Sequence, residues 1–221
     1  MKTFAPRLDI LLPAQRRLWP ELTAVPGRFV LYGGTAIALR LGHRQSVDFD
    51  FFSSEPFEPD QLFEAFPELR KGRRLQSKSN TLRVEIDRGE AVGLSFFGGL
   101  TLGRVGAPER AAGDSVVVAS LLDLAGLKTA VLQERALCKD YEDIAALLRA
   151  GIRLPDALGA AGALYGDMFN PMITLKALTY FVDGDLTKLP SAIKQFLSEQ
   201  AGLVTTIPAI VRASDRIPNE P

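Results

Sequence analysis

Residues 29–52 decide the fold and read FVLYGGTAIALRLGHRQSVDFDFF. The apolar, β-prone run that ends at Tyr32 is typical of a short buried strand, and Gly33 and Gly34 interrupt it. Residues 35–41 then have the apolar spacing of a short helix, whose first amides attract anions. Because glycine has no Cβ, a triphosphate can approach the main chain here, and Thr35 adds a hydroxyl donor. These residues predict a phosphate site, although a lone Gly-Gly-Thr is also typical of an ordinary turn.

The second half of the stretch is a strand that carries two carboxylates. In VDFDFF the strand period of two places Asp48 and Asp50 on one face and Val47, Phe49 and Phe51 on the other. Two neighbouring carboxylates repel each other unless a cation neutralises them. Mg²⁺ is usually held by one or two carboxylates together with water and phosphate oxygens. We therefore predict Asp48 and Asp50 as ligands of Mg²⁺, with Mn²⁺ as the alternative ion; two aspartates that face water on an edge strand are the simpler reading.

The loop between these two elements, GHRQS, carries further polar groups. Arg44 and Ser46 have the chemistry to contact a phosphate or to hold the two aspartates in place, and a plain salt bridge to an aspartate is the alternative for Arg44. His43 is the only histidine of the chain. A Ser-His-Asp triad would need it, but no Gly-x-Ser-x-Gly elbow supplies the serine, so we expect His43 to be a loop residue.

These residues resemble the G-G-[ST]…R-x-S-x-D-x-D signature of AbiEii/AbiGii-type nucleotidyltransferases, within the DNA polymerase β-like superfamily. Two later segments extend the resemblance to roughly residues 29–189: VASLLDLAGLKTAVLQERALCKDYEDIAALL at 118–148 and LKALTYFVDGD at 175–185. The resemblance implies an enzyme that uses an NTP as substrate. It also implies a toxin that is paired with an antitoxin protein, and some relatives act on tRNA ends.

The segment 118–148 is also informative without the resemblance. Residues 118–137 have the apolar spacing of one amphipathic helix. Lys128, Arg135 and Lys139 follow at intervals of seven and four, which predicts one basic stripe facing a phosphate-filled cleft. A solvated face with a Lys139–Asp143 pair is the alternative. The resemblance implies that Lys128, with Arg135, contacts the nucleotide phosphates, and that Asp140 and Asp143 brace these basic groups or take part in catalysis.

One residue departs from the pattern of the superfamily, which commonly has a third carboxylate on a neighbouring strand. Residues 81–99 read TLRVEIDRGEAVGLSFFGG and predict a hairpin with strands at 81–87 and 92–97 around a polar turn. Ser95 stands where many relatives have an aspartate, and a serine cannot replace a carboxylate as a base or as a strong metal ligand. Glu85 and Asp87 are the remaining candidates; we take Asp87 as the catalytic one.

Composition limits the partners and the location. The 26 basic and 26 acidic residues cancel, so no global field attracts nucleic acid or a membrane. The best local basic segment is LRKGRRLQSKS at 69–79, which we expect to be a loop; it is either an RNA contact or a solvated connection. One cysteine excludes an internal disulfide and fits the cytoplasm, and no stretch reaches the length of a membrane span.

The chain is expected to have an α+β fold: a small mixed β-sheet flanked by helices, followed by an α-helical C-terminal lobe. We expect residues 1–112 to form the α/β core, beginning with an N-terminal helix formed by residues 1–25, and residues 113–221 to form the helical lobe, with frayed residues from Ala213. The hypothesis is a Mg²⁺-dependent transfer of a nucleotidyl group from an NTP to an acceptor hydroxyl. The alternatives are a catalytically degenerate relative that binds nucleotide, RNA or a partner protein, and a protein that binds a small metabolite.

Overall fold

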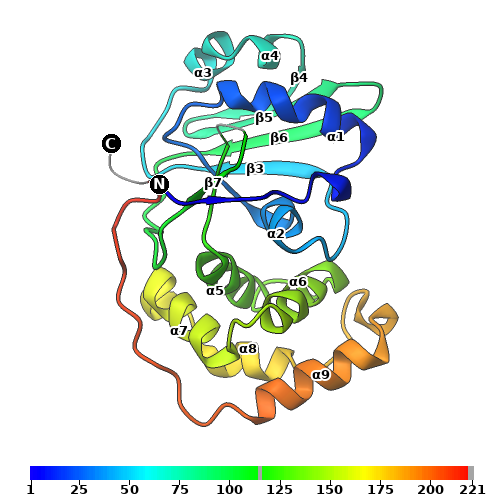
Figure 1. Ribbon diagram of the computed structural model, residues 1–221. Helices are drawn as coiled ribbons and strands as arrows, with labels where there is room; N and C mark the ends of the chain where they lie inside the picture. The colour runs from blue at the N-terminus through cyan, green and yellow to red at the C-terminus, as the bar shows by residue number, and fades with distance from the viewer. Residues whose placement is uncertain (114–115, 219–221) are drawn as a thin grey trace. The chain divides into compact units, whose positions relative to one another are not determined.

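The computed structural model describes residues 1–113 and 116–218 (Figure 1). The contacts within the chain divide it into two compact units. The first unit contains residues 1–103 and 107–120 and the chain from Ser214 onward. The second contains residues 104–106 and 121–213. The boundary expected at 112/113 therefore lies inside the first unit.

The first unit is built on one mixed sheet. Among the described residues its strands are β1 (Thr3–Phe4), β2 (Val30–Tyr32), β3 (Asp48–Phe52), β4 (Arg73–Lys78), β5 (Thr81–Asp87), β6 (Ala91–Phe97), β7 (Glu109–Ala111) and β8 (Val117–Val118). Their order across the sheet is β1-β7-β8-β2-β3-β6-β5-β4. The strand β3 runs antiparallel to β2 and parallel to β6, while β5 is antiparallel to both β6 and β4. The predicted hairpin is confirmed as β5 and β6.

One face of the central strands forms the core of this unit. Phe49 and Phe51 of β3 are almost fully buried, and so is the alternating apolar set of β5 and β6. The ring of Phe51 stacks on Phe96 with centroids 5.2 Å apart, and Trp19 packs against Phe49 at 6.1 Å. Val47 precedes β3 and is 58% exposed, so it is not buried with Phe49 and Phe51, although the alternation predicted all three on one face. The alternation of the strand begins only at Asp48.

Short helices surround the sheet. They are α1 (Pro13–Leu18), α2 (Gly33–Leu41), α3 (Pro59–Ala65) and α4 (Pro67–Arg70). Figure 1 shows α1 across β5 and β6, and α3 and α4 beside β4. The single N-terminal helix expected within residues 1–25 is wrong: a two-residue strand, two 3-10 turns and the six-residue α1 occupy this region. Prolines at 6, 13 and 20 explain the difference, because each disfavours helix at the residue before it.

The second unit is helical in its described residues. It contains α5 (Leu121–Val131), α6 (Cys138–Arg149), α7 (Leu154–Tyr165), α8 (Pro171–Ala177) and α9 (Ser191–Gly202). At the crossing of α5 and α7, an added Cβ at Gly126 would lie 3.0 Å from the Cβ of Ala160, so the two helices are in close contact. Together the two units confirm the expected class, a mixed sheet with flanking helices followed by a helical lobe.

Two segments differ from the sequence-based expectations, one because its charge suggested a loop and the other because its apolar spacing suggested a continuous helix. The basic segment 69–79 is not a loop: residues 73–78 form β4, an edge strand whose charged side chains face solvent, as edge strands commonly do. The helix expected over 118–137 ends at Val131, and a turn leads to α6 at Cys138. The leucine and alanine pattern continues through this turn, so periodicity alone did not reveal it.

The described C-terminal residues are ordered against the first unit. Ile217 is fully buried, and its amide donates to the hydroxyl of Ser54 at 2.7 Å. Arg216 forms an exposed ion pair with Glu55. Fraying from Ala213 is therefore wrong for residues 213–218, and residues 219–221 lie outside the described part of the chain. A single apolar residue between polar ones is a weak signal of burial, which is why the sequence did not predict this contact.

Candidate functional site

The strand β3 holds the two predicted metal ligands on one face. Asp48 is exposed and Asp50 is partly exposed, whereas Phe49 and Phe51 point into the core. The burial of the phenylalanines fixes the register, since a shift by one residue would expose both rings and bury both carboxylates. The strand period of two therefore places the carboxylates side by side, as the sequence predicted.

The glycine pair brings the start of α2 up to this strand. Gly33 has φ +75°, a conformation that side-chain-bearing residues rarely adopt, and α2 begins there. An added Cβ at Gly33 would lie 2.8 Å from Oδ2 of Asp50. At Gly34 it would lie 2.6 Å from Nη2 of Arg44 and 3.0 Å from Oγ of Ser46. The space that the glycines leave is thus shared with three of the predicted site residues, which gather around the first turn of α2.

Thr35 connects the helix to the strand. Its hydroxyl donates to the main-chain carbonyl oxygen of Asp48 at 2.5 Å, and its side chain is buried. A threonine hydroxyl has one proton to donate, and here that proton is directed at Asp48. Thr35 consequently positions the carboxylate strand against α2, and a contact between Thr35 and a phosphate stays a prediction.

The loop between α2 and β3 contributes a cation. The guanidinium of Arg44 lies next to Gly34, and its Nη1 donates to the carbonyl oxygen of Gln45 at 2.8 Å. With Ser46 beside it, the guanidinium lies at the N-terminus of a nine-residue helix, where the helix dipole also favours anions. His43 lies in this loop, as expected. The side chains, the helix start and the glycines therefore form one region suited to phosphate oxygens.

The register of the sheet shows which residues neighbour the two aspartates. On one face, Asp50 is level with Ser95 of β6, and Ser95 is level with Arg83 of β5. In the next row Asp48 is level with Gly93, and Gly93 with Glu85. We call this the carboxylate face, defined by these six residues. The position expected for a third carboxylate is therefore next to Asp50 and holds a serine. Ser95 is only 3% exposed.

Gly93 is a site residue that sequence reasoning missed. An added Cβ there would collide with Oδ1 of Asp48, so the Asp48 carboxylate lies over the main chain of β6. Any larger residue at this position would force the carboxylate to move. A signal was present in the sequence: once the hairpin register is drawn, the glycine falls opposite the first aspartate of β3.

The two candidates for a third carboxylate lie at different distances from the aspartates of β3. Glu85 is in the same row as Asp48, and its Oε1 accepts from Nη2 of Arg73 at 2.9 Å. Asp87 is two residues farther along β5, beyond the start of β3, and its Oδ1 accepts from the amide of Gly89 in the hairpin turn. Strand spacing places the Cα of Asp87 about 12 Å from that of Asp48. A catalytic role for Asp87 stays a prediction, and the register favours neither residue as a direct neighbour of Asp50.

The carboxylate face matches what a magnesium ion requires from a protein. Two carboxylates lie side by side next to a helix start whose amides favour anions, and Mg²⁺ usually takes its other ligands from water and phosphate. Among the described residues no group of three or more histidine, cysteine, aspartate or glutamate side chains is arranged to hold a metal by itself. The donor set therefore fits an ion that is bound together with a nucleotide.

The second unit contains Lys128, one of the predicted basic residues, in a buried cluster. Its Nζ lies 2.7 Å from Oδ1 of Asp140 and 2.7 Å from Oδ2 of Asp143, and both aspartates are fully buried. Arg135 donates to Asp140 from Nε at 2.8 Å, with its side chain 47% exposed. The aspartates thus brace the basic groups, which is one of the two roles that the resemblance implied.

The same cluster corrects the predicted basic stripe. Lys128 is on α5, Arg135 is in the turn that follows, and Lys139 is exposed in the first turn of α6. The three residues do not share one helix, and Asp143 pairs with Lys128 instead of facing solvent with Lys139. Burial pushes the pKa of Asp140 upward, but the hydrogen bond from Arg135 and the charge of Lys128 outweigh it and hold this pKa below its usual range. Asp140 is therefore ionised at neutral pH.

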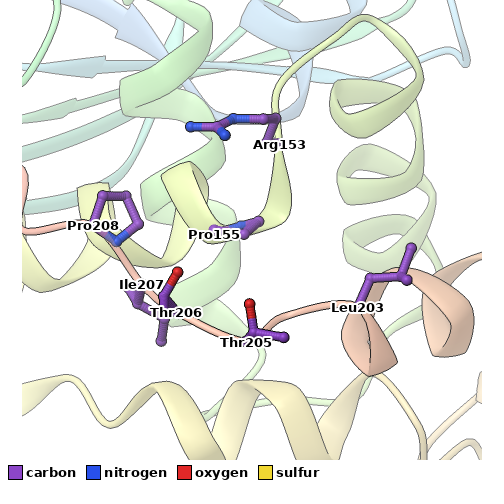
Figure 2. Close-up of a pocket in the computed structure, with 7 residues that line it drawn as sticks. All are labelled: Arg153, Pro155, Leu203, Thr205, Thr206, Ile207 and Pro208. Carbon is purple, nitrogen blue, oxygen red and sulfur yellow. The ribbon is translucent and has the colours of Figure 1, made fainter.

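A cavity lies elsewhere in the second unit. It has a volume of about 290 Å³ and is bounded by Arg153 and Pro155 on one side and by the extended segment 203–208 on the other (Figure 2). None of the residues predicted for the site lines it.

Among the described residues, no helix is both long and apolar enough to cross a membrane.

Comparisons with known proteins bear on the whole chain. The model of the family described as "Nucleotidyl transferase AbiEii toxin, Type IV TA system" matches residues 21–216. An uncharacterized protein of Aquifex aeolicus (strain VF5) is 30% identical over 158 residues, which cover 70% of this chain and 74% of that protein.

Two solved structures share the fold. The nucleotidyltransferase toxin MenT4 of Mycobacterium tuberculosis H37Rv superposes with a TM-score of 0.63 at 17% identity, covering 91% of this chain and 84% of its own. A protein of H. pylori assigned as a nucleotidyltransferase superposes with a TM-score of 0.52 at 15% identity, covering 86% and 91% of the two chains. At these identities the likeness concerns the fold.

Proposed function

The chain belongs to the AbiEii family of nucleotidyl transferase toxins, and on that premise we propose that it moves a nucleotidyl group from an NTP to an acceptor hydroxyl in a Mg²⁺-dependent reaction. Membership confirms the resemblance seen in the sequence, the nucleotidyltransferase fold and the assignment as a nucleotidyltransferase. It also implies an antitoxin partner, because the family is one of type IV toxins. The metal, the residues and the acceptor are the proposed parts.

The observation that supports the proposal most strongly is the meeting of Asp48, Asp50 and the start of α2. Asp50 reaches Gly33, and Arg44 and Ser46 reach Gly34, so carboxylates and phosphate-binding groups share one place. Asp48 and Asp50 would hold Mg²⁺, or Mn²⁺ as the alternative. When bound, such an ion neutralises charge on the phosphates and orients them.

The chemistry that this arrangement serves is an in-line displacement. The acceptor oxygen forms a bond to the α-phosphorus, the bond between that phosphorus and the bridging oxygen breaks, and pyrophosphate leaves with the electron pair. In such reactions the protein mainly positions groups and stabilises charge. The amides of Gly33 and Gly34 and the guanidinium of Arg44 would bind the phosphates that leave. Because Ser95 cannot act as a base, the hydroxyl proton would pass to water or to a carboxylate of the site.

In the second unit, the proposal concerns the cluster around Lys128. We assign Lys128 and Arg135 to the nucleotide phosphates, with Asp140 and Asp143 holding Lys128 in place and Lys139 at the surface of α6. The support is the exposure of Arg135, whose side chain is 47% exposed and is held by Asp140, whereas Lys128 is 6% exposed and anchors the two aspartates. For the acceptor we propose tRNA, and for the location the cytoplasm, where NTPs and tRNA occur together.

A pair of variants tests the proposal. Asp48→Asn keeps the size of the side chain and removes its charge, so transfer of label from α-labelled NTPs to total tRNA should fall by at least about a thousandfold. Asp60→Asn is the matched control, because Asp60 is an exposed carboxylate on α3 in the same unit, and it should keep wild-type activity. Titration with Mg²⁺ should show a midpoint for the wild type and for Asp60→Asn only.

The result can also separate the enzyme from a binding protein. Undiminished transfer by Asp48→Asn would remove the metal assignment. Binding of NTP by the wild type without transfer to any of a panel of RNA and protein acceptors would favour a degenerate relative, for which the serine next to Asp50 is the motivating observation.

A further inference from the structure

Arg83 lies on the carboxylate face, two strands away from Asp50. The register of β3, β6 and β5 places Asp50, Ser95 and Arg83 in one row, with their side chains on the same side of the sheet. Neighbouring strands lie about 4.8 Å apart, so the Cα atoms of Asp50 and Arg83 are about 10 Å apart. An extended arginine side chain spans most of this distance. Its guanidinium can therefore reach a ligand that is held at Asp50.

The charge of Arg83 is not used inside the protein. Arg83 is exposed, and the structure records no ion pair or hydrogen bond of its guanidinium with another described residue. Other basic residues nearby do have partners: Arg73 pairs with Glu85, and Arg74 with Asp60. The row itself explains the difference, because Ser95 is the cross-strand neighbour of Arg83. An aspartate at that position would pair with the arginine across the strands, whereas a serine leaves its charge for an external anion.

The position of Arg83 also says which anion it would meet. The phosphate-binding groups at Gly33, Gly34 and Arg44 lie on the β2 side of Asp50. Arg83 lies on the opposite side, across β6. An NTP whose β and γ phosphates occupy the start of α2 thus leaves the Arg83 side to the molecule that attacks.

We propose that Arg83 binds a phosphate of a polynucleotide acceptor, next to the hydroxyl that attacks the NTP. This inference rests on the proposed function and assigns a residue of the same site to the backbone of the acceptor. Arg83 is a specificity residue: it distinguishes an acceptor that carries phosphodiesters from a protein or small-molecule hydroxyl.

The next row of the same face supports a polynucleotide. It contains Phe52, Phe97, Thr81 and Lys78 in that order across the strands. Phe52 and Phe97 are partly exposed residues, and Lys78 is exposed. One face of the Phe52 ring stacks on Tyr32, with the centroids 4.9 Å apart. Bases stack on aromatic rings, and a backbone of phosphates is attracted by successive basic side chains. The face therefore offers both kinds of contact within two rows.

Binding of a fluorescein-labelled single-stranded RNA of mixed sequence, measured by anisotropy without NTP, tests the proposal. Arg83→Gln should weaken RNA binding about tenfold, the value of one charge-assisted hydrogen bond. The slope of log Kd against log salt should fall by about 0.7, as expected for one lost phosphate contact on a single strand. Arg83→Lys should keep that slope. Arg16→Gln is the matched control, because Arg16 is exposed on α1 of the same unit and outside the row, and it should behave as the wild type.

Each outcome decides for or against the role of Arg83. Unchanged RNA affinity and salt slope in Arg83→Gln would overturn it, as would equal losses in Arg83→Gln and Arg16→Gln. A loss of NTP affinity with unchanged RNA binding would also overturn it, because Arg83 would then serve the nucleotide. Since the RNA measurement needs no turnover, failure of the metal assignment is detected separately, by the activity of Asp48→Asn. Thermal unfolding of each variant confirms that the fold is intact.

Discussion

Two pairs of aspartates in this molecule are separated by short sequence intervals, yet they have opposite surroundings. Asp48 and Asp50 lie on a strand face that reaches solvent, next to a helix start. Asp140 and Asp143 lie on one side of α6, are fully buried, and enclose the ammonium group of Lys128. A carboxylate in a protein interior requires a partner, whereas an exposed one does not.

The difference separates a pair that is accessible to an external cation from a pair that encloses an internal one. In the first unit, Asp48 is exposed and Asp50 is partly exposed, so a cation from solvent can reach both carboxylates. In the second unit, Lys128 and Arg135 neutralise the two aspartates within the fold. The two pairs should therefore respond in opposite ways when a charge is removed: stability should change at one and ligand binding at the other.

The largest expected effect is on stability, at Lys128. Lys128→Met keeps the length of the side chain but removes the ammonium group from between two fully buried carboxylates, which should lower the free energy of unfolding by about 3–5 kcal/mol. Urea unfolding measures this change. The double variant Lys128→Met with Asp143→Asn should recover part of the loss, because one buried charge is removed together with its partner.

A surface pair in the same unit provides the contrast. Arg153 and Asp156 form an exposed ion pair at i,i+3, and Asp156→Asn should change the free energy of unfolding by less than about 1 kcal/mol. If Lys128→Met changed stability no more than Asp156→Asn does, the buried cluster would not be the internally neutralised pair described above.

The next effect is on ligand binding, at Gly93. Gly93→Ala places a methyl group where Oδ1 of Asp48 lies, so the carboxylate must move away from Asp50. We expect the midpoint for Mg²⁺ in the transfer assay to rise about tenfold, which corresponds to roughly 1.4 kcal/mol. Gly113→Ala is not a suitable control because of its positive φ, but Gly27→Ala is, since an added Cβ there meets nothing within 4 Å. An unchanged Mg²⁺ midpoint in Gly93→Ala would separate the metal from Asp48.

The two regions also differ in how far the sequence predicted them. The α2 and β3 region was predicted closely because its signals are local: a glycine break, a helical spacing and a strict alternation over five residues. The place of Gly93 depends on the pairing of β3 with β6, two segments about 45 residues apart, which no local pattern specifies. The family resemblance suggested that Asp140 and Asp143 brace the basic residues, whereas periodicity placed those residues on one continuous helix. The turn at 132–137 brings Lys128 and Asp140 together, and its apolar residues hid it.

A smaller effect is expected at the link between α2 and β3. Thr35→Val keeps the shape of the side chain and removes the hydrogen bond to the carbonyl oxygen of Asp48, which should cost about 1 kcal/mol of stability. Thr35→Ser keeps the hydroxyl and should lose less. If Thr35 positions Asp48, the two variants should also rank in the same order in their Mg²⁺ midpoints, whereas equal midpoints would limit Thr35 to a structural role.

The smallest effect appears only in acid, at Asp140. Burial raises the pKa of this carboxyl, and the stronger effects of Arg135 and Lys128 bring it below the ordinary value of 3.8. The unfolded chain therefore binds more protons than the folded one around pH 4, so the stability that Asp140 contributes is fully present above its unfolded pKa. It is lost as the pH falls through the lower folded pKa. Urea unfolding between pH 6 and about pH 3 should thus show a steeper loss in the wild type than in Asp140→Asn, which has no proton to bind there. Equal slopes would mean that Lys128 and Arg135 do not hold the ionised form of Asp140, and the contrast between the two aspartate pairs would then rest on burial alone.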